Sequence, residues 1–290
     1  MNKTKLVTVT CLAIAAVVMA GLAVWIFLGF SSSGQFAGPS GTYSERGSYS
    51  VPSTDIDALS VDWVSGEVAI IPYDGDDIIF KEYAGRELDD KEALSYDVNG
   101  GSLRIKYSAK AFFGISLFQI PEKRLEVFVP HDAIDDLSID STSADISLSD
   151  FSGATCSIST VSGKMAASAI SCDRLEVDST SGSVSVLDSL VTDAKFSTVS
   201  GDLKLSGEFT NLRSGSTSGG IMFTGQILPK SFYADTVSGD VIVTIPQSET
   251  VSVDFDSVSG DLTYDFDVII SNNPIFKVST TSGNFRIMAL

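Results

Sequence analysis

Residues 235–243 read DTVSGDVIV, and close copies of this stretch recur through the second half of the chain. Among them are STVSGDLKL at residues 197–205, DSVSGDLTY at residues 256–264 and STTSGNFRI at residues 279–287. In each copy, apolar and polar residues alternate on both sides of a Ser-Gly pair. Alternation with a period of two predicts a β-strand with one buried face, and the Ser-Gly pair predicts a sharp turn. We therefore expect each copy to form a strand, a turn and a second strand.

The Ser-Gly pairs recur at nearly constant spacing, which is typical of a repeat architecture. Between Ser143 and Ser282, successive serines lie 19, 19, 19, 18, 20, 21 and 23 residues apart, and Gly follows each of them except Ser143, which precedes Ala144. A unit of this length cannot bury its own apolar face, but stacked copies bury a continuous core. The sequence therefore predicts an all-β fold, a parallel β-solenoid with coils of about 19–20 residues.

We interpret the Ser-Gly pairs as structural corners rather than as catalytic residues. Glycine adopts positive φ angles with little strain, and nearby Ser and Thr hydroxyls can bond local backbone groups. A further pair, Ser65-Gly66, is flanked by the same alternation and predicts a ninth corner. The predicted corner residues are Ser65, Gly66, Ser143, Ser162, Gly163, Ser181, Gly182, Ser200, Gly201, Ser218, Gly219, Ser238, Gly239, Ser259, Gly260, Ser282 and Gly283.

The beginning of the chain differs from the rest. Lys3 and Lys5 precede an uncharged apolar run that ends at Phe30, and this run is longer than the roughly 20 residues that cross a bilayer as a helix. The sequence therefore predicts a cytoplasmic stub and a transmembrane α-helix within residues 1–30. Because the two lysines favour an N-terminus inside the cell, the predicted location is the cell membrane, single-pass, with the main domain extracytoplasmic.

Composition divides the remaining chain further. Residues 31–50 are rich in Gly and Ser and predict a flexible tether. Residues 51–290 predict the extracytoplasmic β-solenoid, with an irregular capping part at 51–130 and regular coils at 131–290. All 37 acidic residues but only 17 of the 19 basic residues follow residue 30, which disfavours binding to nucleic acid. Cys156 and Cys172 could form one disulfide or remain as two buried thiols.

The pattern resembles a family of bacterial cell-envelope proteins of unknown function. The resemblance rests on the opening LSVDWVSGEVAII, on LEVFVP followed by LSIDSTSADISL, and on the STVSGDLKL-type units, and it covers about residues 46–290. Such proteins are described as β-strand-repeat-containing or putative adhesin domains. The resemblance implies a right-handed β-solenoid in a cell-envelope setting, and it brings no catalytic residues.

Candidate chemistry is sparse in this sequence. Asp240 and Asp261 follow corner glycines and are expected to stack on adjacent coils, where they could form a weak cation site or simply serve as turn residues. The single histidine, His131, is expected in a surface turn. No motif of a hydrolase, a zinc enzyme or a nucleotide-binding protein occurs, so no catalytic residue, cofactor or firm metal site is predicted. A polysaccharide-active enzyme with two carboxylates remains an alternative.

Two apolar segments are candidates for interaction. Residues 111–120, AFFGISLFQI, could fold over an open end of the solenoid or present a docking loop. The docking residues would be Phe112, Phe113, Ile115, Leu117 and Phe118. Residues 284–290, NFRIMAL, lack a polar cap and predict an open edge that could pair with another copy.

These observations favour a structural, adhesive or protein-interaction module of a bacterial cell envelope. The predicted partners are the membrane, through the N-terminal helix, and an envelope protein or glycan. The alternative is a regulatory accessory of an envelope-stress response that docks on a membrane partner. Nucleic acid is excluded as a partner by the charge, and the oligomeric state is left open.

Overall fold

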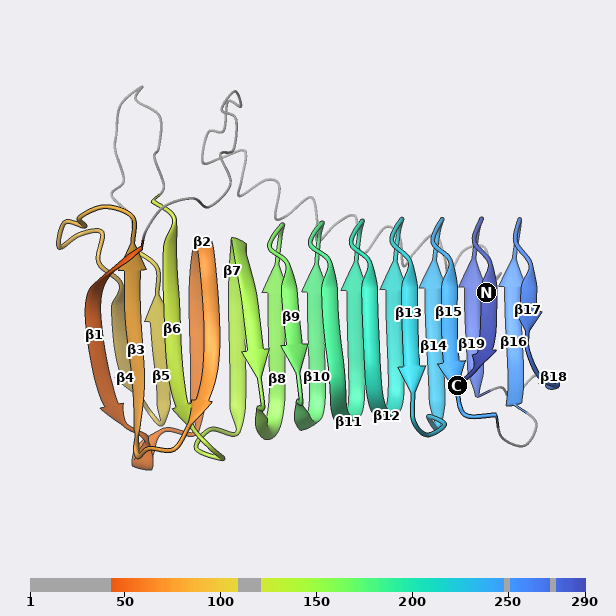
Figure 1. Ribbon diagram of the computed structural model, residues 1–290, viewed down its shortest axis with the longest axis horizontal. Coiled ribbons are helices and arrows are strands. Elements are labelled where there is room, and N and C mark those ends of the chain that lie inside the picture. Colours follow the sequence, from red (N-terminus) through yellow and green to blue (C-terminus); the bar gives the residue numbers. More distant parts are fainter. Residues whose placement is uncertain (1–42, 109–120, 248–250, 272–274) are drawn as a thin grey trace, which may run out of the picture. The chain divides into compact units, whose positions relative to one another are not determined.

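The computed structural model describes residues 43–108, 121–247, 251–271 and 275–290. These residues form β-strands throughout, with one short 3-10 turn, η1 (Ser53–Asp55). The part from Tyr43 to Leu290 is one compact unit, in which the strands stack along a single direction (Figure 1). The fold of the described residues is therefore all-β.

Strand bounds follow the predicted alternation of apolar and polar residues. The N-terminal strands are β1 (Ser44–Pro52), β2 (Ala58–Tyr73), β3 (Asp77–Ala84), β4 (Ser95–Asn99), β5 (Ser102–Lys106) and β6 (Lys123–Pro130). The coils that follow contain β7 (Asp136–Ser149), β8 (Ser152–Thr160), β9 (Met165–Ser168), β10 (Ser171–Ser179), β11 (Val184–Thr198), β12 (Leu203–Ser216) and β13 (Ile221–Gly225). The last strands are β14 (Ser231–Thr236), β15 (Val241–Ile245), β16 (Val251–Ser257), β17 (Leu262–Tyr264), β18 (Val268–Ile270), β19 (Phe276–Thr280) and β20 (Phe285–Ala289).

Each coil contributes one strand segment before the Ser-Gly pair and one after it, so the segments form two rows. In the first row, β7 pairs in parallel with β8, β8 with β10 and β10 with β11. In the second row, β7 pairs with β9 and β9 with β11. Alternate side chains point inward, and they form one continuous apolar core along the stack. This repeated burial is what a single coil could not achieve alone.

The corner glycines are required by close packing rather than by positive φ angles. A Cβ atom built on Gly182 would overlap the carbonyl oxygen of Gly163, and one built on Gly163 would overlap that of Ala144. The same clash recurs at each later corner glycine, so these residues form a glycine spine, along which the backbone of each coil lies directly against the backbone of the next. The sequence-based reason for glycine at these corners is therefore corrected: of the predicted corner glycines only Gly66 has a positive φ, and it lies inside β2.

Hydroxyl groups complete the corners from Gly163 to Gly239. The N–H of Gly163 donates to Thr160 Oγ1 at 3.1 Å, and the same bond, from glycine to the hydroxyl three residues earlier, recurs at Gly182, Gly201, Gly219 and Gly239. The serines before these five glycines donate their hydroxyls to carbonyls of the preceding coil, as Ser181 does to Val161 at 3.1 Å. These hydroxyls are therefore occupied by structural hydrogen bonds.

The last coils do not stack in the order of the sequence. β19 pairs with β14 on one side and β16 on the other, and β20 pairs with β15 and β17. The coil made of β19 and β20 thus lies between the coil of β14 and β15 and the coil of β16 and β17 (Figure 1). Two expectations are corrected by this insertion. Asp240 and Asp261 are not on adjacent coils, and the strand within residues 284–290 is internal instead of an open edge.

The predicted transmembrane helix requires a correction to the fold class. Residues 1–30, on which it was placed, lie outside the described residues, and no helix of the described part is long and apolar enough to cross a membrane. The fold class is therefore all-β without that helix. The location that rested on it, a single-pass protein of the cell membrane with an extracytoplasmic main domain, is corrected with it, because no helix of the described residues could provide the membrane span.

Candidate binding groove

An open groove of about 340 Å³ lies where the N-terminal strands meet the first regular coil. Its volume is within the roughly 300–1,000 Å³ of typical ligand pockets. Three polar residues stand in register across it, because Asp62 of β2 pairs with Asp140 of β7 and Asp140 pairs with Ser159 of β8. The lining residues are Asp62, Trp63, Val64, Lys106, Tyr107, Asp140, Ser141, Thr142 and Ser159.

The two carboxylates of the groove have different partners. Asp62 accepts hydrogen bonds from Arg104, with Nε at 2.8 Å and Nη2 at 2.7 Å from its Oδ2. Asp140 forms no ion pair with any cation of the described part of the chain. Burial raises the pKa of Asp140 above its ordinary 3.8, and the neighbouring Asp62 carboxylate raises it further. Although partly desolvated in the groove, Asp140 remains exposed, so its carboxylate is open to a ligand hydrogen bond.

Two aromatic rings line the groove beside these carboxylates. Trp63 and Tyr107 meet edge to face, with ring centroids 5.1 Å apart. Trp63 is only 2% exposed, and its indole Nε1 is buried without a hydrogen-bond partner. Buried indole N–H groups usually find a partner, so this donor is an unused polar group at the groove.

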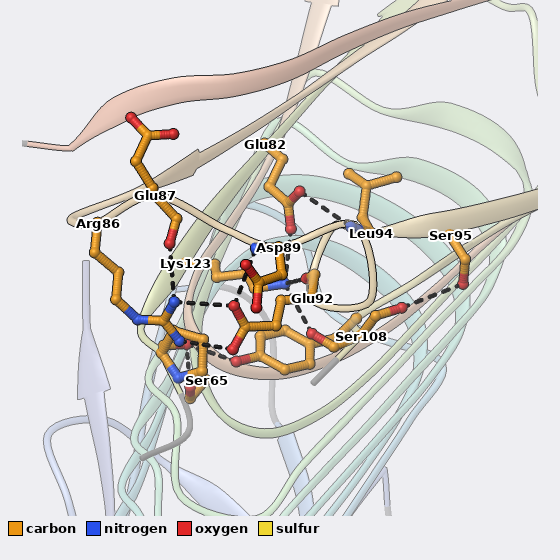
Figure 2. Close-up of polar contacts among 12 residues, drawn as sticks. Ser65, Glu82, Arg86, Glu87, Asp89, Glu92, Leu94, Ser95, Ser108 and Lys123 are labelled. Carbon is orange, nitrogen blue, oxygen red and sulfur yellow. Dashed lines mark hydrogen bonds and ion pairs between the residues drawn. The ribbon is translucent and has the colours of Figure 1, made fainter. Parts of the chain in front are cut away.

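The Trp63 and Tyr107 rings pack against a buried ion pair, which is shown in Figure 2. The Lys123 ammonium lies 2.8 Å from Glu82 Oε1, and the two side chains are 0% and 1% exposed. Lys123 also donates to the carbonyls of Ser108, at 2.9 Å, and Glu92, and its Nζ lies 4.2 Å from the Tyr107 ring centroid. Burial lowers the pKa of Lys123, although the bond to Glu82 opposes that shift.

A second ion pair lies beside the first (Figure 2). Arg86 donates two hydrogen bonds to the Glu92 carboxylate, at 2.8 and 2.9 Å, which lower the pKa of Glu92 and raise that of Arg86. Glu82 accepts the N–H of Leu94 at 3.0 Å. With two cations and two carboxylates, the cluster balances its charge, as buried ions must.

This cluster also holds the start of β6 against β2. Tyr107 donates its hydroxyl to the Pro121 carbonyl at 2.6 Å, and burial raises the pKa of Tyr107. Gly66 has a φ of 97°, and any Cβ there would overlap the backbone of Lys123. The glycine thus lets β6 approach β2 closely. Sequence reasoning missed the cluster because Glu82 and Lys123 are 41 residues apart, and neither belongs to a motif.

Comparison with known proteins assigns the chain to a family. The sequence profile of Toastrack DUF4097 matches residues 56–288, which is most of the chain. The chain belongs to the Toastrack DUF4097 family. No curated protein matches it in sequence.

The chain is also similar to solved structures. A putative adhesin from Bacteroides fragilis is 12% identical with a TM-score of 0.51, and the match covers 87% of this chain and 99% of that one. A putative lipid binding protein from Parabacteroides distasonis is 15% identical, with a TM-score of 0.49 and coverage of 85% and 97%. A putative adhesin from Parabacteroides merdae is 12% identical, with a TM-score of 0.45 and coverage of 87% and 97%. At these identities the likeness to the first of them shows the fold alone.

The two acidic residues predicted as cation ligands in this Toastrack domain both contact Asn284. Asp240 Oδ1 accepts the N–H of Asn284 at 2.8 Å and its side-chain amide at 3.2 Å. The N–H of Asp261 donates to Asn284 Oδ1 at 3.1 Å, so Asn284 stands between the two predicted cation ligands. Among the described residues, no group of three His, Cys, Asp or Glu side chains is placed to hold a metal ion.

The other predicted site residues of the Toastrack chain do not converge. His131 lies 3.8 Å from Asp74 and from Asp150, beside a cavity of only about 20 Å³. Cys156 and Cys172 are free buried thiols, and burial raises the pKa of Cys172 to about 11. The interaction-loop candidates Phe112, Phe113, Ile115, Leu117 and Phe118 lie outside the described residues.

Proposed function

We propose that the protein is a non-catalytic binding module that holds a polyhydroxylated chain, a glycan, in the groove. The observation that carries this proposal is the row of Asp62, Asp140 and Ser159 beside the Tyr107 ring. Carboxylates accept strong hydrogen bonds from hydroxyl groups, and the apolar face of a sugar ring can pack on an aromatic side chain. The buried cluster around Lys123 holds that side chain in place, which lowers the entropy cost of binding.

The first row of strands extends the same chemistry beyond the groove. From Ser159 the register continues to Asp178, Ser197, Gly215 and Asp235, and then to Ser279. Carboxylates and hydroxyls thus alternate along most of this line, with neighbouring strands about 4.8 Å apart. An extended polymer that crosses the strands would meet similar groups at regular intervals, which suits a repeating glycan better than a single small molecule.

The net charge of the chain narrows the class of glycan, and a similar structure supports a binding role. The chain carries a formal charge of −18, which disfavours polyanionic glycans and favours neutral or basic ones. The B. fragilis structure that shares this fold is described as a putative adhesin, and this description is consistent with a binding role. The reasons for a non-catalytic role are the family's lack of an assigned activity and the structural use of most carboxylates at the corners.

The proposal is tested by calorimetric titration of the purified full chain with neutral cello-oligosaccharides and chito-oligosaccharides. We expect binding to at least one of them, weakened about tenfold by Asp140→Ala because a charge-assisted bond is lost. Glu208→Ala removes an exposed carboxylate outside the groove and serves as the matched control.

Two results would contradict the proposal. Absence of binding to every oligosaccharide, or equal binding by the Asp140→Ala variant, would remove the groove as a glycan site. Release of reducing ends that stops in an Asp140→Asn variant would instead show a glycoside hydrolase, because such enzymes work through a pair of carboxyl groups.

A further inference from the structure

The coil of β16 and β17 exposes residues that occupy core positions. In the second row, neighbouring strands place Phe223, Val243, Ile287 and Tyr264 side by side, at positions whose side chains point toward the core. The first three residues are at most 1% exposed, but Tyr264 is 50% exposed. Figure 1 places β17 and β18 at the end of the stack opposite β1 and β4. The core at this end is therefore missing a covering layer.

The backbone at this end is also open. β17 pairs only with β20 among the described strands. The carbonyl of Asp261 accepts the N–H of Phe285, and the N–H of Asp265 donates to the carbonyl of Ile287, so these groups face β20. Because successive residues of a parallel strand address opposite neighbours, the N–H and C=O groups of Leu262 and Tyr264 face the open side. They form a template for one more strand.

The negative charge of this coil favours a basic partner. Residues 251–271 contain five aspartates and no basic residue. On the inner side, basic residues of the inserted coil meet this acidic surface: Lys277 lies 3.5 Å from Asp254, and Arg286 lies 3.8 Å from Asp265. Asp261 and Asp267 have no ion pair within the described part of the chain. A second copy would bring the same aspartates against each other, which is unfavourable.

We propose that the β17 edge binds an extended segment of a partner protein in which apolar and basic residues alternate. The segment adds a strand to Leu262–Tyr264, its apolar side chains cover Tyr264, and its basic side chains face the aspartates. This mode of recognition draws affinity from main-chain hydrogen bonds and specificity from alternate side chains. It is independent of the glycan groove, which lies at the other end of the stack.

The chain itself contains a strand of this chemistry. β20 reads FRIMA and occupies the inner side of β17, with Phe285 and Ile287 buried and Arg286 pointing outward. A peptide with the sequence of residues 283–290 is therefore a rational probe for the outer side. The same peptide with Arg286→Glu keeps the apolar pattern and reverses the charge.

The experiment measures the fluorescence anisotropy of labelled peptide as the full chain is added. We expect the native peptide to bind, to lose affinity as salt rises, and to bind at least about tenfold more tightly than the Arg286→Glu peptide. On the full chain, Tyr264→Lys should abolish binding, because the lysine ammonium would stand where the apolar side chains of the peptide must pack. Tyr264→Phe keeps the apolar ring and should bind as the unchanged chain does.

Four outcomes would overturn the proposal. The peptide fails to bind; both peptides bind equally; Tyr264→Lys leaves binding unchanged; or sedimentation shows that the chain occupies this edge with a second copy. Tyr264 is half exposed at the end of the stack, so both variants should fold, and matching unfolding temperatures would confirm that the loss is one of binding.

Discussion

The core of the solenoid is covered to different extents at its two ends. At the N-terminal end, β1 pairs antiparallel with β3, and Tyr49 and Tyr96 pack on Phe80, which is fully buried. At the other end, Tyr264 occupies a core position and remains half exposed. A stack of identical coils has no natural end, so each end needs its own solution. The comparison indicates that aromatic side chains cover the last core residue at one end, whereas the last core residue at the other end remains half exposed.

Closure at the N-terminal end depends on residues with no counterpart in the repeat. The buried pair of Lys123 and Glu82 and the antiparallel strands β3 and β6 replace the regular coil there. Such a pair contributes little net stability, but it fixes one arrangement of the strands because any other would leave a buried charge unpaired. The open end has no buried ion pair among its described residues. It keeps the close packing of the corner glycines, but the hydroxyls of Ser257 and Thr280 are buried there without a hydrogen-bond partner.

Cross-linking tests the coil order on which the description of the open end depends. Outward residues Ile242, Arg286 and Thr263 follow one another in register on β15, β20 and β17. Adjacent strands are about 4.8 Å apart, which a disulfide can bridge, but two strand spacings are too far. We expect oxidation to join Ile242→Cys to Arg286→Cys completely, and not to join Ile242→Cys to Thr263→Cys. The reverse result, read by mass spectrometry, would mean that the coils stack in sequence order.

Loss of the Lys123 charge should be the most destabilising single change at the closed end. Lys123→Met leaves Glu82 buried without a counter-charge, so we expect the free energy of unfolding to fall by about 3–5 kcal/mol. Urea denaturation measures this change. The double variant Lys123→Met with Glu82→Leu removes both charges and should recover much of the loss. A double variant as unstable as the single one would show that packing, and not charge, holds this end.

The glycine spine allows the middle of the stack to be compared with its open end. Gly182→Ala places a Cβ against the Gly163 carbonyl within a coil held on both sides, and we expect a loss of about 1–3 kcal/mol. Gly260→Ala makes the same clash with Gly283, but its coil lies at the open end and can shift outward, so the loss should be smaller. Gly85→Ala, with open space around it, is the control in urea denaturation. Equal losses at Gly182 and Gly260 would contradict the idea of a yielding end.

The smallest expected effect concerns Asp140 in the groove. Its pKa is raised in the folded chain, so its ionised form is less favourable folded than unfolded. This cost is present near neutral pH and disappears as pH falls below the ordinary 3.8, where the group is protonated in both states. Asp140→Asn should therefore raise the melting temperature near neutral pH and change it little in acid. A lower melting temperature at neutral pH would show that the Asp140 carboxylate is stabilised by its surroundings.

The sequence predicted the repeat well because its signal is local. Ser181, Gly182 and the alternating residues around them determine one strand, one corner and the next strand, and each coil repeats that information. The order of the last coils could not be predicted for the same reason. Corners at Ser238, Ser259 and Ser282 carry the same motif, so each coil fits beside either of the others, and only the longer spacings of 21 and 23 residues allow the chain to cross.

The groove was harder to predict than the coils. Asp62 and Asp140 are 78 residues apart in the chain and become neighbours only because β2 pairs directly with β7. Between them the chain forms the irregular strands β3 to β6, which follow no repeat. A periodic pattern predicts which residues share a ladder only where the period holds, so the site at the junction of regular and irregular parts needed the structure.

The inserted coil affects how the protein is made. β19 and β20 leave the ribosome after β16 to β18, although they lie between β16 and β14 in the finished stack. Chains generally fold from the N-terminal side during synthesis, and here β16 carries the corner motif that fits the surface of β14. The place beside β14 must therefore stay empty, or be vacated, until residues 276–289 arrive. Docking of β19 and β20 beside β14 and β15 can occur only after those residues have been translated.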